Sequence, residues 1–208
     1  MINPDRYLAG ALASIHYQFR PDELAYLAAT TKVEGPFRDR LAFRIYEDHV
    51  GTGTIVAREW SHPLQRVDIA ILDREQVPLV LIELKALYAY DAVLKPGEYA
   101  AKTLADERKA HLVSVDATAV YSLMLVTHLH GEVKGFTSRT VKYMDRINLE
   151  VRRRGGADKV RSLAIQALDA ELTGRNVVAR GEVPGGSAFG RNVSVLYWLV
   201  RNDRPAAL

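Results

Sequence analysis

The sequence predicts an α/β protein in which helices flank a mixed central sheet. Apolar residues at helical spacing dominate the first fifty residues. From residue 54 the pattern changes to short runs rich in Val, Ile and Leu, which are typical of strands. A helical stretch later separates two such runs, and a connection of that length permits parallel pairing within one sheet.

Three helices are expected before the first strand. Asn3-Pro4-Asp5 is typical of a helix start, because a capping side chain precedes a proline in the first turn. Glu34-Gly35-Pro36 opens the third helix, and Gly51-Thr52-Gly53 ends it. The three helices are expected at 3–18, 20–29 and 34–50. Residues 1–33 are therefore assigned to helices that precede the core.

The core is expected between residues 34 and 130. Its elements after the third helix are strands at 54–60, 66–72 and 77–87, a helix at 98–111 and a strand at 119–128. Polar turns at 61–63 and 73–76 separate the first three strands, which predicts a meander. The run Val77–Leu87 is apolar almost throughout, as expected for a strand buried on both faces. The core is thus predicted to have the order α-β-β-β-α-β.

An α/β extension is expected after the core, over residues 131–208. Helices at 138–154 and 157–172 join at Gly155-Gly156. Strands at 177–183 and 193–201 surround the flexible loop 184–191. The strongly apolar last strand either completes the central sheet or supplies a dimer interface. Without repeats or an evident linker, residues 1–208 are predicted to form one domain.

Composition narrows the classes of protein. The chain has 208 residues, 48% of them hydrophobic and 25% charged, as in an ordinary globular protein. The absence of cysteine excludes disulfides, thiolate zinc sites and cysteine nucleophiles. There is no secretory signal pattern, and no apolar run approaches the roughly 18–20 residues that span a bilayer. We therefore expect a soluble cytoplasmic protein with no membrane partner.

Charge is unevenly distributed along the chain. The net charge is +3, yet the segment Lys134–Arg180 holds eleven Lys/Arg and five Asp/Glu, a net charge of +6. A phosphate-binding surface beside an acidic metal site would produce this distribution. A solvated helical face explains the charge equally well.

Charged residues interrupt two apolar strands at Asp68 and at Glu83-Leu84-Lys85. A hairpin centred between residues 75 and 76 places Asp68 opposite Glu83, with Cβ atoms about 5 Å apart. A divalent cation would remove the repulsion between these carboxylates, and Mg²⁺ favours such oxygens. Lys85 shares the sheet face of Glu83 because side chains alternate along a strand. Leu84 points to the other face, while its carbonyl can still reach the metal.

These residues resemble the PD-(D/E)XK nuclease superfamily, which has the restriction-endonuclease-like fold. Its signature is an acid on one strand and acid-x-lysine on the next, here Val67-Asp68 and Glu83-Leu84-Lys85. Proline before the aspartate is missing. The predicted order of elements over residues 34–128 agrees with that fold, so the resemblance covers nearly half of the chain.

The resemblance implies a set of metal ligands and a reaction. Asp68 and Glu83 would hold Mg²⁺, with Mn²⁺ as a substitute, and Lys85 would position or activate water. Glu34 resembles an additional acid that many members use. The implied activity is a Mg²⁺-dependent DNA endonuclease that hydrolyses phosphodiesters.

The biological setting is open. Restriction or another defence role comes first, followed by repair or recombination, and then an antibacterial toxin. A non-catalytic nucleic-acid-binding member of the fold is the main rival. An enzyme acting on another phosphate substrate is a further one. Cutting both strands of a duplex commonly requires two active sites, which is compatible with a symmetric homodimer.

Several basic residues are candidates for DNA contact. Lys102 lies on the crossover helix, where family members often place a basic residue facing the site, although a solvated position is equally expected. Arg152, Arg153 and Arg154 end a helix, where the macrodipole alone favours positive charge. Arg191 lies in the loop between the last two strands and could contact a nucleic acid or belong to a simple hairpin loop.

His128 and His130 alternate at the end of a strand and could form a metal-binding pair. No third ligand is evident nearby in the sequence. An ordinary strand end at the surface is therefore the favoured interpretation of these two residues.

Overall fold

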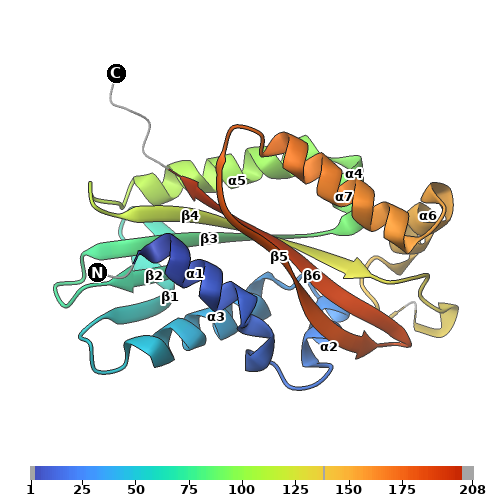
Figure 1. Ribbon diagram of the computed structural model, residues 1–208, viewed down its shortest axis with the longest axis horizontal. Helices are drawn as coiled ribbons and strands as arrows, with labels where there is room; N and C mark the ends of the chain where they lie inside the picture. The colour runs from blue at the N-terminus through green and yellow to red at the C-terminus, as the bar shows by residue number, and fades with distance from the viewer. Residues whose placement is uncertain (1–2, 138, 203–208) are drawn as a thin grey trace.

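The computed structural model describes residues 3–137 and 139–202 and shows a six-stranded mixed sheet with helices on both faces (Figure 1). The strand order is β1-β2-β3-β4-β6-β5. The strands are β1 (Ile55–His62), β2 (Gln65–Leu72), β3 (Pro78–Tyr88), β4 (Ala119–Leu129), β5 (Asn176–Ala188) and β6 (Arg191–Asn202). The helices are α1 (Pro4–Ala13), α2 (Glu23–Thr30), α3 (Glu34–His49), α4 (Ala89–Leu94), α5 (Pro96–His111), α6 (Met144–Arg154) and α7 (Ala157–Glu171), with 3₁₀ turns η1 (Ile15–Gln18) and η2 (Gly135–Thr137).

The sheet topology agrees with the predicted core. β1, β2 and β3 form an antiparallel meander, and β3 pairs in parallel with β4 after the crossover through α4 and α5. The predicted register between β2 and β3 is confirmed, since Ile69 pairs with Ile82 and Ala70 with Leu81. Asp68 and Glu83 follow directly beyond the last pair of this ladder, Ile69 and Ile82.

Two hydrophobic clusters define the two faces of the sheet near β2 and β3. Ile82 and Leu84 belong to the cluster that contains Phe37 of α3. Leu81 belongs to the other cluster, together with Ala110 of α5. Because side chains alternate along a strand, Glu83 and Lys85 share the α5 face with Leu81.

The last two strands differ from the prediction. Residues 184–188 were expected to lie in a loop, but β5 continues through them to Ala188, leaving only a tight turn at Phe189 and Gly190. β5 is an edge strand, where proline is tolerated, and a bulge between Pro184 and Gly186 absorbs the irregular sequence. Gly186 has φ +88°, and the Asp22 carboxylate accepts a hydrogen bond from the Ser187 N–H at 2.7 Å.

The sequence left open whether the last strand, β6, completes the central sheet or supplies a dimer interface. β6 lies inside the sheet between β4 and β5, with residues 193–200 buried. The apolar strand therefore completes the central sheet, because both of its edges and both of its faces are covered.

Two helices were also misjudged. The segment after β3 contains the short helix α4, where the Asp91 carboxylate accepts a hydrogen bond from the Tyr88 N–H. The helix expected at 138–154 begins only at Met144, and Ser138 lies outside the described residues. Of the helices that the structure describes, none is both long enough and apolar enough to cross a membrane.

Replacing Tyr88 by phenylalanine is expected to lower the free energy of unfolding by about 1–2 kcal/mol, because two backbone carbonyls lose their shared donor. The Tyr88 hydroxyl lies 3.0 Å from the carbonyl oxygens of Ala28 and Thr31 and joins β3 to the end of α2. Denaturant unfolding measures the change. Tyr17→Phe is the control, since Tyr17 is 79% exposed; an equal loss in both variants would contradict this role of Tyr88.

Candidate active site

The candidate site lies where β2 and β3 stop pairing. Their ladder runs from Leu72 and Pro78 to Ile69 and Ile82 and is not continued. Beyond that point β2 still pairs with β1, and β3 still pairs with β4. We call this opening between the two strands the fork.

Two carboxylates replace the missing strand partner along β3. The Leu84 N–H donates to Asp68 Oδ2 at 2.8 Å, and the Ala86 N–H donates to Glu34 Oε2 at 3.1 Å. Glu34 is the first residue of α3, where the helix dipole favours a negative charge. The N–H and C=O of one strand residue point to the same side, so the Leu84 carbonyl is also directed into the fork.

Glu83 is the most buried acid of the fork, with 9% of its surface exposed. Burial raises its pKa to about 9, and the neighbouring carboxylates of Asp68 and Asp106 act in the same direction. Its Oε1 atom is buried without a hydrogen-bond partner among the described residues. Glu83 is therefore protonated at neutral pH unless a cation offsets the surrounding negative charge.

Lys85 is held by an acid that the sequence analysis missed. Its Nζ lies 2.6 Å from Asp106 Oδ2 on α5. Burial lowers the pKa of Lys85, but Asp106, Glu34 and Asp68 outweigh that effect and raise it above the usual value. Lys85 is therefore a cation directed at the acidic group. The only sequence signal for Asp106 is its helical spacing from Ala110, which packs on the same sheet face.

Arg38 and Glu59 form a second missed pair at the edge of the fork. Arg38 Nη1 lies 2.5 Å from Glu59 Oε1 and 3.7 Å from Asp68 Oδ1. Glu59 lies in β1 with φ +49°, in the left-handed region that L residues seldom adopt. Such irregular strand residues re-aim side chains near functional sites. No sequence pattern marks Glu59.

The structure thus brings Glu34, Asp68, Glu83 and Lys85 to one place. The carboxylate oxygens of the three acids do not, however, all lie within 4.8 Å of one another.

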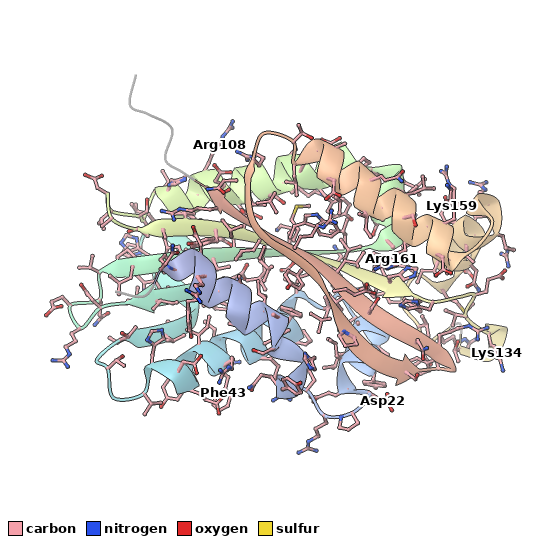
Figure 2. The ribbon with its side chains drawn as sticks, viewed as in Figure 1. Asp22, Phe43, Arg108, Lys134, Lys159 and Arg161 are labelled. Carbon is pink, nitrogen blue, oxygen red and sulfur yellow. The ribbon has the colours of Figure 1, made fainter. Side chains whose placement is uncertain are left out.

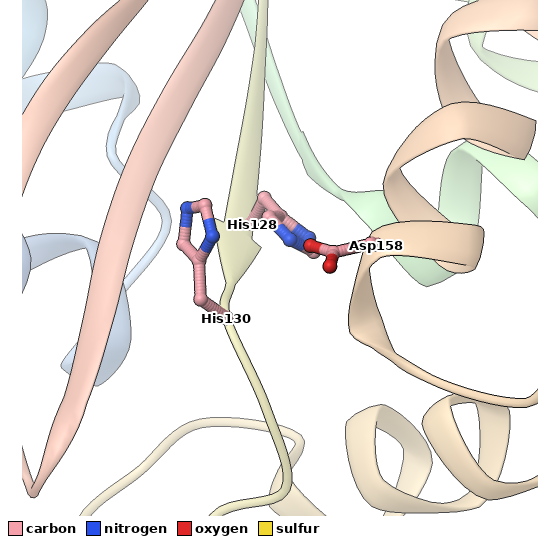
Figure 3. A group of neighbouring side chains, drawn as sticks. All are labelled: His128, His130 and Asp158. Atoms are coloured by element: carbon pink, nitrogen blue, oxygen red, sulfur yellow. The ribbon is translucent and has the colours of Figure 1, made fainter.

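In the described part of the chain, one group of potential metal ligands does lie within 4.8 Å of one another: His128, His130 and Asp158 (Figure 3). Asp158 is the third ligand that the sequence did not reveal.

The basic candidates pair with groups other than the fork carboxylates. Lys102 pairs with Glu98, one helical turn away on α5, and its Nζ lies 2.6 Å from Glu98 Oε1. Arg152 pairs with Glu132, and both Arg153 and Arg154 pair with Glu150. Arg191 donates to the Glu132 carbonyl at 2.5 Å. Their contact with DNA stays a prediction.

The substitution Glu83→Gln is expected to remove a pH dependence of stability in EDTA. The folded-state pKa of about 9 lies above the ordinary 4.5, so this stabilisation is complete below pH 4.5 and is lost as the pH rises through 9. Between pH 4.5 and 9, the free energy of unfolding should fall more steeply with pH in the wild type than in the variant. The difference in slope should be up to about 1.4 kcal/mol per pH unit. Denaturant unfolding at several pH values measures the difference.

Glu98→Gln is the control for this experiment. Pairing with Lys102 and Lys95 lowers the pKa of the exposed Glu98, so its charge does not change over the same pH range. Equal slopes for the wild type and Glu83→Gln would refute the buried, proton-binding state of Glu83.

Comparison of the chain with models of known protein families, with curated proteins and with solved structures finds no match. Function is therefore inferred from the chemistry and geometry of the fork.

Proposed function

We propose that this protein is a Mg²⁺-dependent DNA endonuclease of the PD-(D/E)XK type. The observation that carries the proposal is the fork, where Asp68 and Glu34 accept hydrogen bonds from Leu84 and Ala86 on the free edge of β3, beside Glu83 and Lys85. The element order α3-β1-β2-β3-α4-α5-β4, in which α4 and α5 together form the crossover, supports the same family. An acid on β2 lies beside acid-x-lysine on β3, since the Asp68 carboxylate accepts a hydrogen bond from the Leu84 N–H, which supports the same assignment.

The donor set of the fork fits a hard divalent cation. Its candidate ligands are the carboxylates of Asp68, Glu83 and Glu34 and the carbonyl of Leu84, all of which supply oxygen. Glu83 Oε1 is buried without a partner among the described residues, and a cation would satisfy it. When bound, Mg²⁺ would polarise a phosphate and lower the pKa of its water.

Lys85 supplies the positive charge of the protein itself. It shares the sheet face of Glu83 and stays protonated, so it can stabilise negative charge that develops on a phosphate oxygen. Asp106 holds the Lys85 ammonium group and limits its orientations. Arg38 approaches Asp68 from α3 and offsets part of the charge of the carboxylates.

A nucleic acid is favoured over a small phosphate substrate by the basic segment of residues 134–180. It forms α6, α7 and the start of β5, and Lys134 and Lys159 lie at the same end of the molecule (Figure 2). Six of its arginines pair with carboxylates: Arg152, Arg153, Arg154, Arg161, Arg175 and Arg180. Pairs that are partly exposed are weak and can be exchanged for phosphate contacts.

The substitutions Asp68→Asn and Lys85→Ala are each expected to reduce Mg²⁺-dependent cleavage of plasmid DNA by about 100-fold or more. Asparagine keeps an acceptor for the Leu84 N–H and removes only the charge. Gel analysis of supercoiled plasmid, linear duplex, single-stranded DNA and RNA, with Mg²⁺, Mn²⁺ or EDTA, measures the rates and the substrate class.

Asp73→Asn and Lys95→Ala are the matched controls. Asp73 also accepts a strand N–H, from Val77 at 2.8 Å, and Lys95 also pairs with a carboxylate, that of Glu98. Cleavage that persists in EDTA or in the fork variants would refute the mechanism. Binding without cleavage would identify a non-catalytic member, and discrete fragments would indicate a site-specific endonuclease.

The triple substitution Arg152→Ala, Arg153→Ala and Arg154→Ala is expected to weaken the salt dependence of duplex binding in EDTA. Each phosphate contact that is lost lowers the slope of log affinity against log salt by about 0.9. Fluorescence anisotropy at several salt concentrations measures it. Arg44→Ala is the control, because Arg44 pairs with Asp48 on α3. An unchanged slope would assign the three arginines to helix stabilisation alone.

A further inference from the structure

A second group of metal-ligating side chains lies at the end of β4. His128 lies near the end of β4, His130 follows directly after the strand, and Asp158 projects toward them from the first turn of α7 (Figure 3). One ligand atom from each residue lies within 4.8 Å of the other two. The ligands of a tetrahedral Zn²⁺ ion lie about 3.3 Å apart, given bond lengths of about 2.0–2.1 Å. A small side-chain rotation would therefore close the group around an ion.

His128 points to a ligand independently of this spacing. It is 2% exposed, and its Nε2 atom is buried without a hydrogen-bond partner among the described residues. A buried polar atom without a partner is costly, and natural proteins seldom leave one unexplained. The two imidazole rings lie 4.5 Å apart between centroids, at 67° to each other. A metal ion bound between the histidines and Asp158 would satisfy His128.

The surroundings of His130 resemble the outer shell of a metal site. His130 Nε2 lies 3.0 Å from the Ser194 hydroxyl on β6. Ser194 in turn bonds to Glu182 of β5, which pairs with Arg161 of α7. A metal-bound histidine commonly uses its second nitrogen for such a hydrogen bond, which fixes the ring and leaves the other nitrogen for the metal. The positive charge of Arg161 beside His128 is offset in part by Glu182 and Asp158.

We propose that His128, His130 and Asp158 bind a divalent transition-metal ion, with Zn²⁺ as the expected metal, and that this ion ties α7 to β4. Imidazole nitrogen suits Zn²⁺ and related ions and does not suit Mg²⁺. Three protein ligands leave a further position for water. The ion would hold the basic helices α6 and α7 on the sheet.

This site is separate from the fork. Glu83 pairs with Ser122 across β3 and β4, and His128 lies six residues further along β4. At about 3.3 Å per residue, Glu83 and His128 are about 20 Å apart along the strand direction. The zinc site therefore does not depend on the proposed nuclease activity, and each can fail without the other.

Zinc titration of the full chain, stripped with EDTA and dialysed, tests the proposal. Competition with a chromogenic chelator should show one tightly bound equivalent of Zn²⁺. His130→Ala is expected to weaken binding by about 100-fold and Asp158→Asn by about tenfold, on the scale set by outer-shell substitutions. Both side chains are exposed, so these variants should fold; circular dichroism in EDTA checks this. Zn²⁺ should also raise the melting temperature of the wild type more than that of either variant.

His62→Ala and the double variant Asp68→Asn, Glu83→Gln are the controls, and both should bind Zn²⁺ as the wild type does. An equal concentration of Mg²⁺ should not displace the ion. The proposal is overturned if the wild type binds no stoichiometric Zn²⁺, or if His130→Ala and Asp158→Asn bind it unchanged. Loss of binding in the double variant would instead place the zinc at the fork and equally overturn it.

Discussion

The separation of β2 from β3 beyond Ile69 and Ile82 is the constraint on which the proposed activity depends. A strand in mid-sheet that loses its neighbour exposes N–H groups, and these need other partners when they are buried. Asp68 and Glu34 accept hydrogen bonds from two of them, at Leu84 and Ala86. The need to satisfy the β3 backbone thus gathers carboxylates beside Glu83, where the proposed cation would bind.

The electrostatics of the fork follow from this crowding. Glu83 is buried between acids, which raises its pKa to about 9. Lys85, two residues further along the same strand face, is paired with Asp106 and keeps its proton. Glu83 resists ionisation, whereas Asp68 and Glu34 accept hydrogen bonds from the backbone. With Lys85, these acids form a group whose negative charge is incompletely balanced. Such perturbed groups are typical of functional sites.

The remainder of the fold positions a second polar group on the same sheet face. β4 carries Ser122 beside Glu83 and continues to His128 and His130, where α7 crosses the strand end. Buried polar residues lie at both places, in strands that are otherwise apolar, and polar groups buried there need partners. The covering helices α5 and α7 supply Asp106 and Asp158, one acid to each group.

The sequence by itself determined the core order, the meander, the crossover and the β2–β3 register, because hydrophobic periodicity and turn residues are local signals. It also placed Asp68, Glu83 and Lys85 together, since one hairpin joins them. Only the tertiary structure decided that β6 completes the sheet and that β5 runs through Pro184, because pairing at an edge overrides local propensity. It likewise brought Asp106, Arg38, Glu59 and Asp158 to their partners. Those contacts join elements far apart in sequence, and no spacing along the chain encodes them.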